Sequence, residues 1–196
     1  MAGIYRNLWY KTCKYGLSLL PDILFHNAVG LIMYKRFHVP FHWMNTKHPK
    51  TFSEKLNWLK THPVIPNEAE LADKYDVRDF IKRTIGEQYL VPILGVWDNA
   101  DDIDFDKLPN QFVLKMTKGS GYNLICNNKS KLDIWKTRKM LRDWLKVNCY
   151  YFSREPQYKG KSKLIAEEML EYNITDYKFF CFNGDPKFVE LYIDRL

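Results

Sequence analysis

Short runs of β-branched and aromatic residues, each bounded by polar or turn-forming residues, predict the strands of this protein. They lie at residues 89–91, 93–97, 112–117, 124–127 and 163–168. Two further runs, at 177–182 and 187–193, flank Asn183-Gly184, a dipeptide that favours the tight turn of a β-hairpin. The sequence therefore predicts a hairpin over residues 177–193.

Apolar residues at helical spacing predict three helices. The first covers residues 51–59 and begins at Thr51 or Ser53. The second has a capping-box-like start at Asn67–Glu70 and stops at Gly86, and the third begins at Ser130, with Asp133 three residues later. The apolar faces of the three helices are Phe52, Leu56 and Leu59; Val77, Phe80, Ile81 and Ile85; and Ile134, Leu141, Trp144 and Leu145.

The order of these elements indicates an α+β fold, because helices and hairpins fall in separate blocks and do not alternate as βαβ units. At 196 residues, 46% of them hydrophobic, the chain is long enough to bury a core. Its four cysteines are scattered without the spacing of a zinc site. Reduced thiols in a cytoplasmic protein are therefore expected, and not a disulfide framework.

Positive charge is concentrated at the N-terminal end. Residues 1–60 hold nine lysines and arginines against Asp22 and Glu54, whereas the remaining residues are balanced. Pro21, Asp22 and His26 interrupt the apolar run of this segment, so neither a transmembrane helix nor a signal peptide is expected. The segment could be a helical extension packed on the main domain, or a surface for an anionic membrane or a partner. Nucleic acid is not expected, because no known binding motif accompanies the charge.

The stretch FVLKMTKGSGYNLI at 112–125 places two lysines and two glycines at the bend between two strands. A dinucleotide fingerprint needs its glycines between a strand and a helix, and a Walker loop needs Gly-Lys-Ser/Thr, so both are excluded. One interpretation is a hairpin flap whose N–H groups close over an anion, with Lys115 reaching its charge. The alternative is an ordinary glycine turn with solvated lysines.

The neighbouring segments extend this pattern. ADKYDVRDFI (72–81), the FVLKMTKGSGYN stretch, LIAEEMLE (164–171) and DYKFFCFNGDPKFVELYIDR (176–195) follow one another in an order that resembles the TupA-like branch of the ATP-grasp superfamily, over about residues 48–195. This branch is associated with teichuronopeptide and other surface-polysaccharide biosynthesis. The resemblance implies an α+β, ATP-grasp-like fold with two α+β subdomains. We expect a basic, aromatic-rich helical N-terminal extension at 1–64, a first subdomain with the flap at 65–162, and the start of a truncated second subdomain at 163–196.

The resemblance also implies an ATP site. Lys74 and Lys115 would contact the α- and β-phosphates, and Lys178 would lie near the γ-phosphate. Glu167 would line the pocket, and backbone groups of Glu168 and Leu170 would pair with the adenine edge. The flap residues would be Gly119, Ser120 and Gly121, and the basic residue near the transferred phosphate or the substrate carboxylate would be Arg195. Lys118 departs from the family pattern, because many members have a histidine there.

Magnesium is implied together with ATP, but no metal ligand is assigned in this sequence. In the family, the acidic and asparagine ligands follow the point equivalent to Asp194-Arg195, so this chain alone is expected to be inactive. The acidic stretch DNADDIDFD (98–106) is interpreted as a capped turn.

The function implied is ATP-dependent carboxylate–amine ligation, in which a carboxylate of an acidic sugar or an amino acid is phosphorylated and then attacked by an amine. One alternative is a non-catalytic nucleotide- or partner-binding remnant in polysaccharide assembly. Another is a glycosyltransferase-like transferase, for which Asp101-Asp102-Ile103-Asp104 is a loose metal motif. The protein would be cytoplasmic or peripheral at the inner face of the membrane.

Overall fold

The computed structural model describes residues 8–38, 40–45, 47–62, 64–170 and 175–193. The strands are β1 (Ile93–Trp97), β2 (Phe112–Met116), β3 (Asn123–Cys126), β4 (Leu164–Glu168), β5 (Asp176–Phe182) and β6 (Asp185–Tyr192). The helices are η1 (Thr12–Gly16, a π-helix), α2 (Asp22–Phe37), α3 (Phe52–Thr61), α4 (Glu68–Ala72), α5 (Val77–Thr84), α6 (Ile134–Leu145) and α7 (Tyr150–Ser153). Short 3₁₀ turns are η2 (Glu87–Tyr89), η3 (Ala100–Asp102), η4 (Phe105–Lys107), η5 (Lys129–Lys131) and η6 (Pro156–Tyr158).

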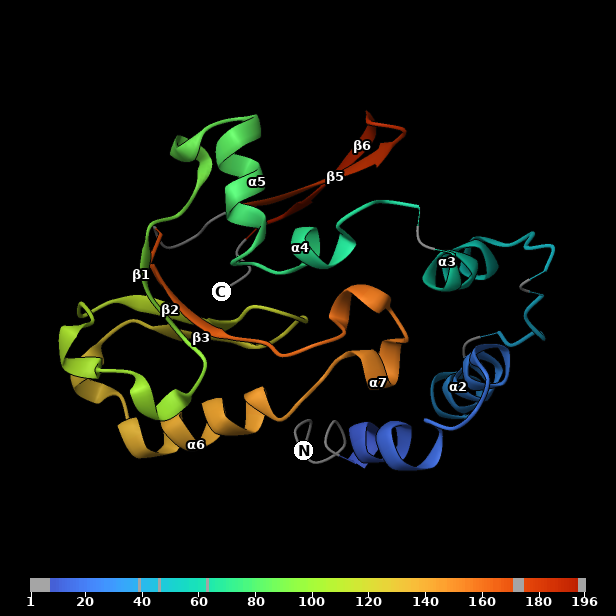
Figure 1. The fold of residues 1–196 in the computed structure, drawn as a ribbon, viewed down its shortest axis with the longest axis horizontal. Helices are drawn as coiled ribbons and strands as arrows, with labels where there is room; N and C mark the ends of the chain where they lie inside the picture. Colours follow the sequence, from blue (N-terminus) through green and yellow to red (C-terminus); the bar gives the residue numbers. More distant parts are fainter. Residues whose placement is uncertain (1–7, 39, 46, 63, 171–174, 194–196) are drawn as a thin grey trace.

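Four strands form an antiparallel sheet in the order β1-β4-β2-β3, and β5 and β6 form a separate two-stranded hairpin. The fold is thus mixed α+β, as predicted. Helix α6 runs along one face of the larger sheet (Figure 1). None of the helices in the described ranges is long and apolar enough to cross a bilayer.

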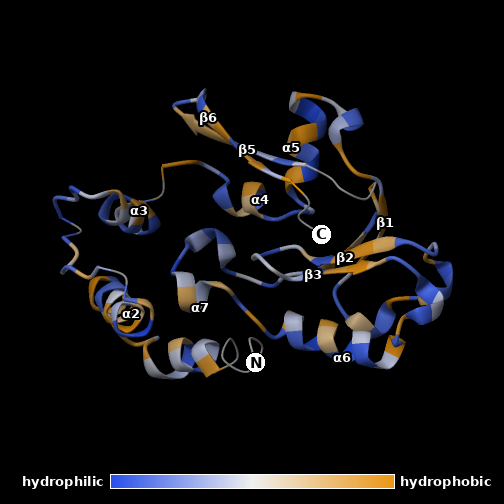
Figure 2. Ribbon diagram, turned by 180° about the vertical axis from the view of Figure 1, so that it is seen from behind, coloured by the Kyte–Doolittle hydropathy of each residue, from blue (hydrophilic) through white to orange (hydrophobic). Residues whose placement is uncertain are grey.

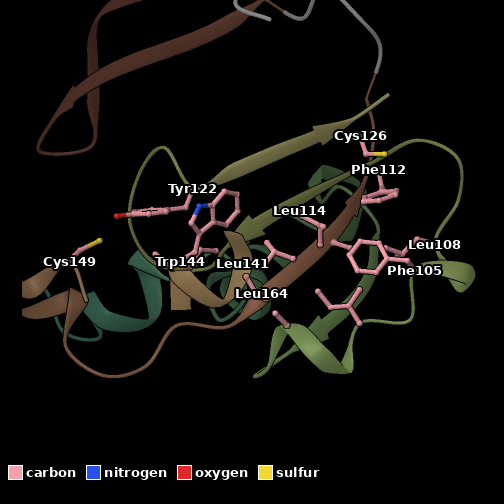
Figure 3. Packing of buried hydrophobic residues seen from close by; sticks show 14 residues of the cluster. Phe105, Leu108, Phe112, Leu114, Tyr122, Cys126, Leu141, Trp144, Cys149 and Leu164 are labelled. Carbon is pink, nitrogen blue, oxygen red and sulfur yellow. The ribbon is translucent and has the colours of Figure 1, made fainter. Parts of the chain in front are cut away.

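The hydrophobic core fills the space between α6 and the sheet. Four side chains that are 0% exposed meet there: Phe112 and Leu114 of β2, Leu164 of β4 and Leu141 of α6 (Figure 3). In β2 the side chains alternate, so Phe112 and Leu114 point into the core and Lys115 points to the opposite face. This alternation places a charged residue on the sheet face that α6 does not cover.

The N-terminal segment packs on the domain through α7 and the residue after it, Arg154. The Arg154 guanidinium donates to the carbonyl oxygens of Leu17, Ser18 and Leu20 at 2.9–3.2 Å and lies 4.5 Å from the centroid of the Phe25 ring. Tyr10 adds a contact, because its hydroxyl donates to the Lys146 carbonyl. The described part of this segment thus contains helices and contacts α7 and the end of α6, while the division into an extension and two subdomains stays a prediction.

Several local predictions are confirmed. Thr51 caps α3, and its hydroxyl and the Glu54 carboxylate form a complete capping box. Strands β1 to β6 match the predicted runs within about two residues, as boundaries normally do. The hairpin turn has both Asn183 and Gly184 at positive φ, 53° and 80°. All four cysteines are free thiols.

Other local predictions are wrong. The single helix expected from Asn67 to Gly86 is two helices, α4 and α5, and Asn67 adopts φ 64° without capping through its side chain. Residues 89–91 form no strand, since Tyr89 ends the 3₁₀ turn η2. Ser130 lies in the turn η5, and Asp133 is the residue that caps α6. The expected apolar face of α3 is largely exposed, at 70%, 44% and 39% for Phe52, Leu56 and Leu59.

Candidate functional site

Two charged residues meet on the sheet face opposite the core. Strands β2 and β4 pair so that Val113 is opposite Glu167 and Lys115 is opposite Ile165, which places Lys115 diagonal to Glu167. The Lys115 Nζ donates to the Glu167 Oε2 at 2.5 Å. The Glu167 side chain is 9% exposed, so its negative charge is compensated by its cationic partners more than by water.

Arg78 of α5 is the second partner of Glu167. Its Nη1 lies 3.4 Å from the Glu167 Oε1, and its Nη2 donates to the Val91 carbonyl at 2.6 Å. Glu167 therefore lies between two cations from different elements. We did not predict Arg78 from the sequence, although it lies four residues after Lys74 in the motif ADKYDVRDFI.

Lys74 reaches the site because the chain leaves helical geometry between α4 and α5. The Asp73 carboxylate accepts from the N–H groups of Tyr75 and Asp76, and the Lys74 N–H donates to the Thr117 carbonyl at 3.0 Å. The Lys74 Nζ also donates to the carbonyl oxygens of Thr117 and Gly119, at 3.2 and 2.7 Å. Burial lowers the pKa of Lys74; nearby Asp73 opposes this shift and Lys115 adds to it.

The turn between β2 and β3 is fixed by hydrogen bonds from Thr117 to Lys163 and by the packing of Gly119 against Cys149. Thr117 is buried; its N–H donates to the Lys163 carbonyl, and its hydroxyl accepts from the Lys163 N–H. Gly119 and Gly121 have φ of 93° and 76°, a region that disfavours side chains. A Cβ on Gly119 would lie 2.5 Å from the Cys149 Sγ, whereas one on Gly121 would meet open space. The predicted glycine hairpin is therefore present, with its first glycine fixed by close packing.

Successive N–H groups of this turn are open to a ligand. Those of Gly119, Ser120 and Gly121 donate to no acceptor in the described part of the protein. N–H groups that follow one another around a turn with positive φ can form a concave anion site. The Gly119 carbonyl faces the Lys74 Nζ, so the Ser120 N–H of the same planar peptide points to the other side of the turn.

The remaining predicted residues lie further out. Glu168 is exposed, and its N–H donates to the Pro92 carbonyl at 3.0 Å. An adenine base could therefore pair only with the Glu168 carbonyl oxygen. Leu170 is 52% exposed. The Lys178 Nζ lies 4.0 Å from the centroid of the Tyr192 ring within the β5–β6 hairpin, with no contact to the Lys115–Glu167 pair among the described residues. Arg195 lies outside the described residues.

Lys118, which stands where a histidine was expected, turns away from the site. Its Nζ donates to the Lys159 carbonyl at 2.9 Å. The acidic stretch 98–106 is a capped turn, as predicted: the Asn99 and Asp104 side chains accept from the N–H groups of Asp101 and Asp106. The Asp101 carboxylate also forms an ion pair with Arg142. These bonds engage the Asp101 and Asp104 carboxylates, two of the three in the loose metal motif.

One cavity lies beside the turn and not over the charged cluster. It measures about 1020 Å³ and is lined by η1, the ends of α6 and α7, and the turn residues Gly119 and Ser120. Lys74, Lys115 and Glu167 are not among its walls. A second cavity, of about 560 Å³, lies between α3 and α4. The charged cluster lies on the sheet face opposite α6, where Arg78 of α5 reaches it.

Comparison with known proteins gives one match. The family model described as TupA-like ATPgrasp matches residues 54–196, which include β1 to β6, the glycine turn and every residue of the charged cluster. No curated protein and no solved structure matches the chain.

Proposed function

Because this chain belongs to the TupA-like ATP-grasp family, we propose that it binds ATP on the face of the β1-β4-β2-β3 sheet that α6 does not cover. The phosphates would lie against Lys74, Lys115 and the N–H groups of Gly119 to Gly121. The adenine would lie toward the end of β4, near the Glu168 carbonyl and the Leu170 N–H. Lys178 and Arg195 are proposed for the γ-phosphate and substrate end, as the resemblance implies.

The observation that carries this proposal is the convergence of donors from separate segments. Lys115 comes from β2, Lys74 from the break between α4 and α5, and Gly119 to Gly121 from the turn. Lys74 is held against the turn by its bond to the Gly119 carbonyl, so its charge is fixed beside the turn in the free protein. Donors that are already ordered lose little entropy when a phosphate binds.

When no ligand is bound, the Glu167 carboxylate compensates the positive charge of Lys115 and Arg78. It lies within 3.4 Å of both Lys115 and Arg78, so each cation has a partner in the free protein. A triphosphate would compete for Lys115, while Arg78 would remain to balance Glu167. We propose that Lys115 can move from Glu167 to a phosphate because Arg78 keeps the buried carboxylate paired.

Magnesium is bound together with ATP by ATP-grasp proteins in general. The described residues contain no group of three or more His, Cys, Asp or Glu side chains that could hold a metal ion. Glu167, the carboxylate nearest the proposed phosphates, is already paired with two cations. The site described here therefore offers phosphate contacts but does not fit a magnesium ion.

We propose ligation as the reaction class. The γ-phosphoryl group would pass from ATP to a substrate carboxylate oxygen and release ADP; an amine would then attack the acyl carbon and displace inorganic phosphate. An acidic sugar of a surface polysaccharide and an amino acid are the proposed substrates. The cations and the turn would contribute by holding the phosphates in one orientation, since phosphoryl transfer depends mainly on positioning and electrostatic stabilisation.

Calorimetric titration with ATP, ADP and adenosine tests the binding step. If the phosphates meet Lys74, Lys115 and the turn, affinity should fall from ATP to ADP and be weakest for adenosine. Equal affinity for all three would show that the phosphates make no contact, and would contradict the proposed orientation. Release of ADP that requires both a carboxylate and an amine would test the ligation step separately.

A further inference from the structure

The N-terminal extension, residues 8–60, has a surface that is both cationic and apolar. Its described residues include eight lysines and arginines but only two acids, Asp22 and Glu54. Glu54 is buried and accepts from backbone N–H groups of residues 45, 50 and 51, and Asp22 pairs with Arg154 of the domain. Neither acid offsets the extension's own lysines, so its surface attracts anions.

Helix α2 is anchored at one end only. Phe25, His26 and Asn27, in its first half, are buried, and Arg154 stacks on Phe25. Beyond them, hydrophobic residues recur around the helix (Figure 2), while Lys35 and Arg36 lie in its last turn. A helix that is apolar around much of its circumference is normally covered.

One stripe of α2 combines both properties. Leu24, Leu31 and Lys35 follow at intervals of seven and four residues, which puts them on a single helical face. Leu24 is 42% exposed and Leu31 is 41% exposed, and Lys35 and Arg36 lie in the last turn of the helix. The stripe therefore presents leucines toward solvent with a cation beside them.

Further apolar side chains of the extension project singly from other segments. Leu19 is 92% exposed, Tyr15 71% and Trp43 63%, each in a different stretch of chain. A protein partner would need a matching pocket for each, and protein interfaces are depleted in lysine at their centres. A lipid surface takes up scattered apolar groups without shape matching and leaves lysines at the headgroups.

We propose that the extension docks on an anionic lipid surface, with the Leu24–Leu31–Lys35 stripe of α2 against the bilayer and the lysines and arginines among the headgroups. The extension is itself docked on α7 through Arg154. Docking would therefore hold the whole domain at the membrane. This proposal is independent of nucleotide binding.

Cosedimentation of the intact chain with vesicles tests the proposal. Vesicles of phosphatidylcholine are compared with vesicles of equal parts phosphatidylcholine and phosphatidylglycerol, at low and at physiological salt. We expect recovery with the anionic vesicles only, weakened but not abolished by salt. Lys35→Glu/Arg36→Glu should reduce the partition coefficient on the order of 30-fold or more, and Leu31→Ser by roughly 10-fold.

A matched charge reversal on α6 and the preceding turn is the control. Lys131→Glu/Lys139→Glu makes the same change in net charge at two exposed lysines outside the extension. This variant should keep most of its binding. Three outcomes would each overturn the proposal. The first is an equal loss of vesicle binding in both double variants, and the second is equal recovery with neutral vesicles. The third is binding to an acidic polymer such as polyglutamate in place of vesicles. Circular dichroism of every variant distinguishes loss of binding from loss of folding.

Discussion

Lys115 and Glu167 form an ion pair across neighbouring strands, with the Lys115 Nζ 2.5 Å from the Glu167 Oε2 on the sheet face opposite the core. Their side chains are 32% and 9% exposed, so this pair is more shielded than a surface salt bridge. Arg78 shares the carboxylate. The pair thus stabilises the face on which we place the nucleotide.

Glu167→Gln should destabilise the protein. The substitution leaves Lys115 and Arg78 facing each other without the shared carboxylate, and we expect a loss of about 1–3 kcal/mol of unfolding free energy, less than for a fully buried pair. Urea denaturation at neutral pH measures it. Glu190→Gln, on the exposed strand β6, is the matched control and should change stability by less than about 0.5 kcal/mol. Equal losses of unfolding free energy in the two variants would show that Glu167, with its partners Lys115 and Arg78, stabilises the protein no more than an exposed glutamate does.

Gly119→Ala should disturb the turn more than Gly121→Ala. Both glycines have positive φ, which costs an alanine about 1–2 kcal/mol. Only Gly119 also has the Cys149 Sγ where a Cβ would stand. Cys149→Ala in the same chain should therefore restore part of the stability lost in Gly119→Ala and none of that lost in Gly121→Ala. Denaturant unfolding of Cys149→Ala, the two glycine variants and the two double variants gives this coupling energy, and a value of zero for Gly119 would contradict the contact.

Arg154→Lys should release the extension from the domain. A lysine has a point charge and cannot donate to Leu17, Ser18 and Leu20 while stacking on Phe25. We expect amides of residues 22–30 to exchange at least 10-fold faster, the equivalent of about 1.4 kcal/mol. The amides of β2 and β4 should be unaffected. Unchanged exchange in α2 would show that Arg154 is not what docks it.

Acid should weaken α3 through Glu54. Its carboxylate accepts from the N–H groups of Asn45, Thr51 and Lys50, which lower the pKa of Glu54 from 4.5 to about 2. Since the folded pKa lies below the unfolded one, the contribution is complete above pH 4.5 and is lost as pH falls toward 2. Glu54→Gln should reduce stability at neutral pH and make the local stability of α3 less dependent on pH in that window. Hydrogen exchange of α3 across the window measures this.

Local signals in the sequence predicted much of the fold. The alternation of Phe112, Leu114 and Met116 with Lys115 is visible in the sequence because a strand repeats every two residues. The Thr51–Glu54 capping box and the Asn183-Gly184 turn are likewise encoded by adjacent residues. These features needed no knowledge of distant parts of the chain.

Long-range contacts explain most of the errors. The expected helix from Asn67 breaks because Asp73 bonds to nearby N–H groups and the Lys74 N–H pairs with Thr117, which is 43 residues away. This break is what delivers Lys74 to the turn. Arg78 was missed for the same reason, since its role depends on where Glu167 lies. The family resemblance pointed to Lys74, Lys115 and Glu167, but the two ion pairs of Glu167 and the packing of Gly119 against Cys149 emerged only from the structure.

The central claim, that Lys115 contacts the phosphates of a bound nucleotide, is tested most directly by titrating ATP into three proteins in a calorimeter: the unchanged chain, Lys115→Ala and Lys139→Ala. Lys139 is an exposed lysine of α6, on the other side of the sheet. Arg78 still balances Glu167 in Lys115→Ala, so that variant should fold. We predict that Lys115→Ala weakens ATP binding by about 1.5–3 kcal/mol, roughly 10- to 150-fold, and that Lys139→Ala binds like the unchanged chain. Equal ATP affinity in all three proteins, or no binding by any, would contradict the account.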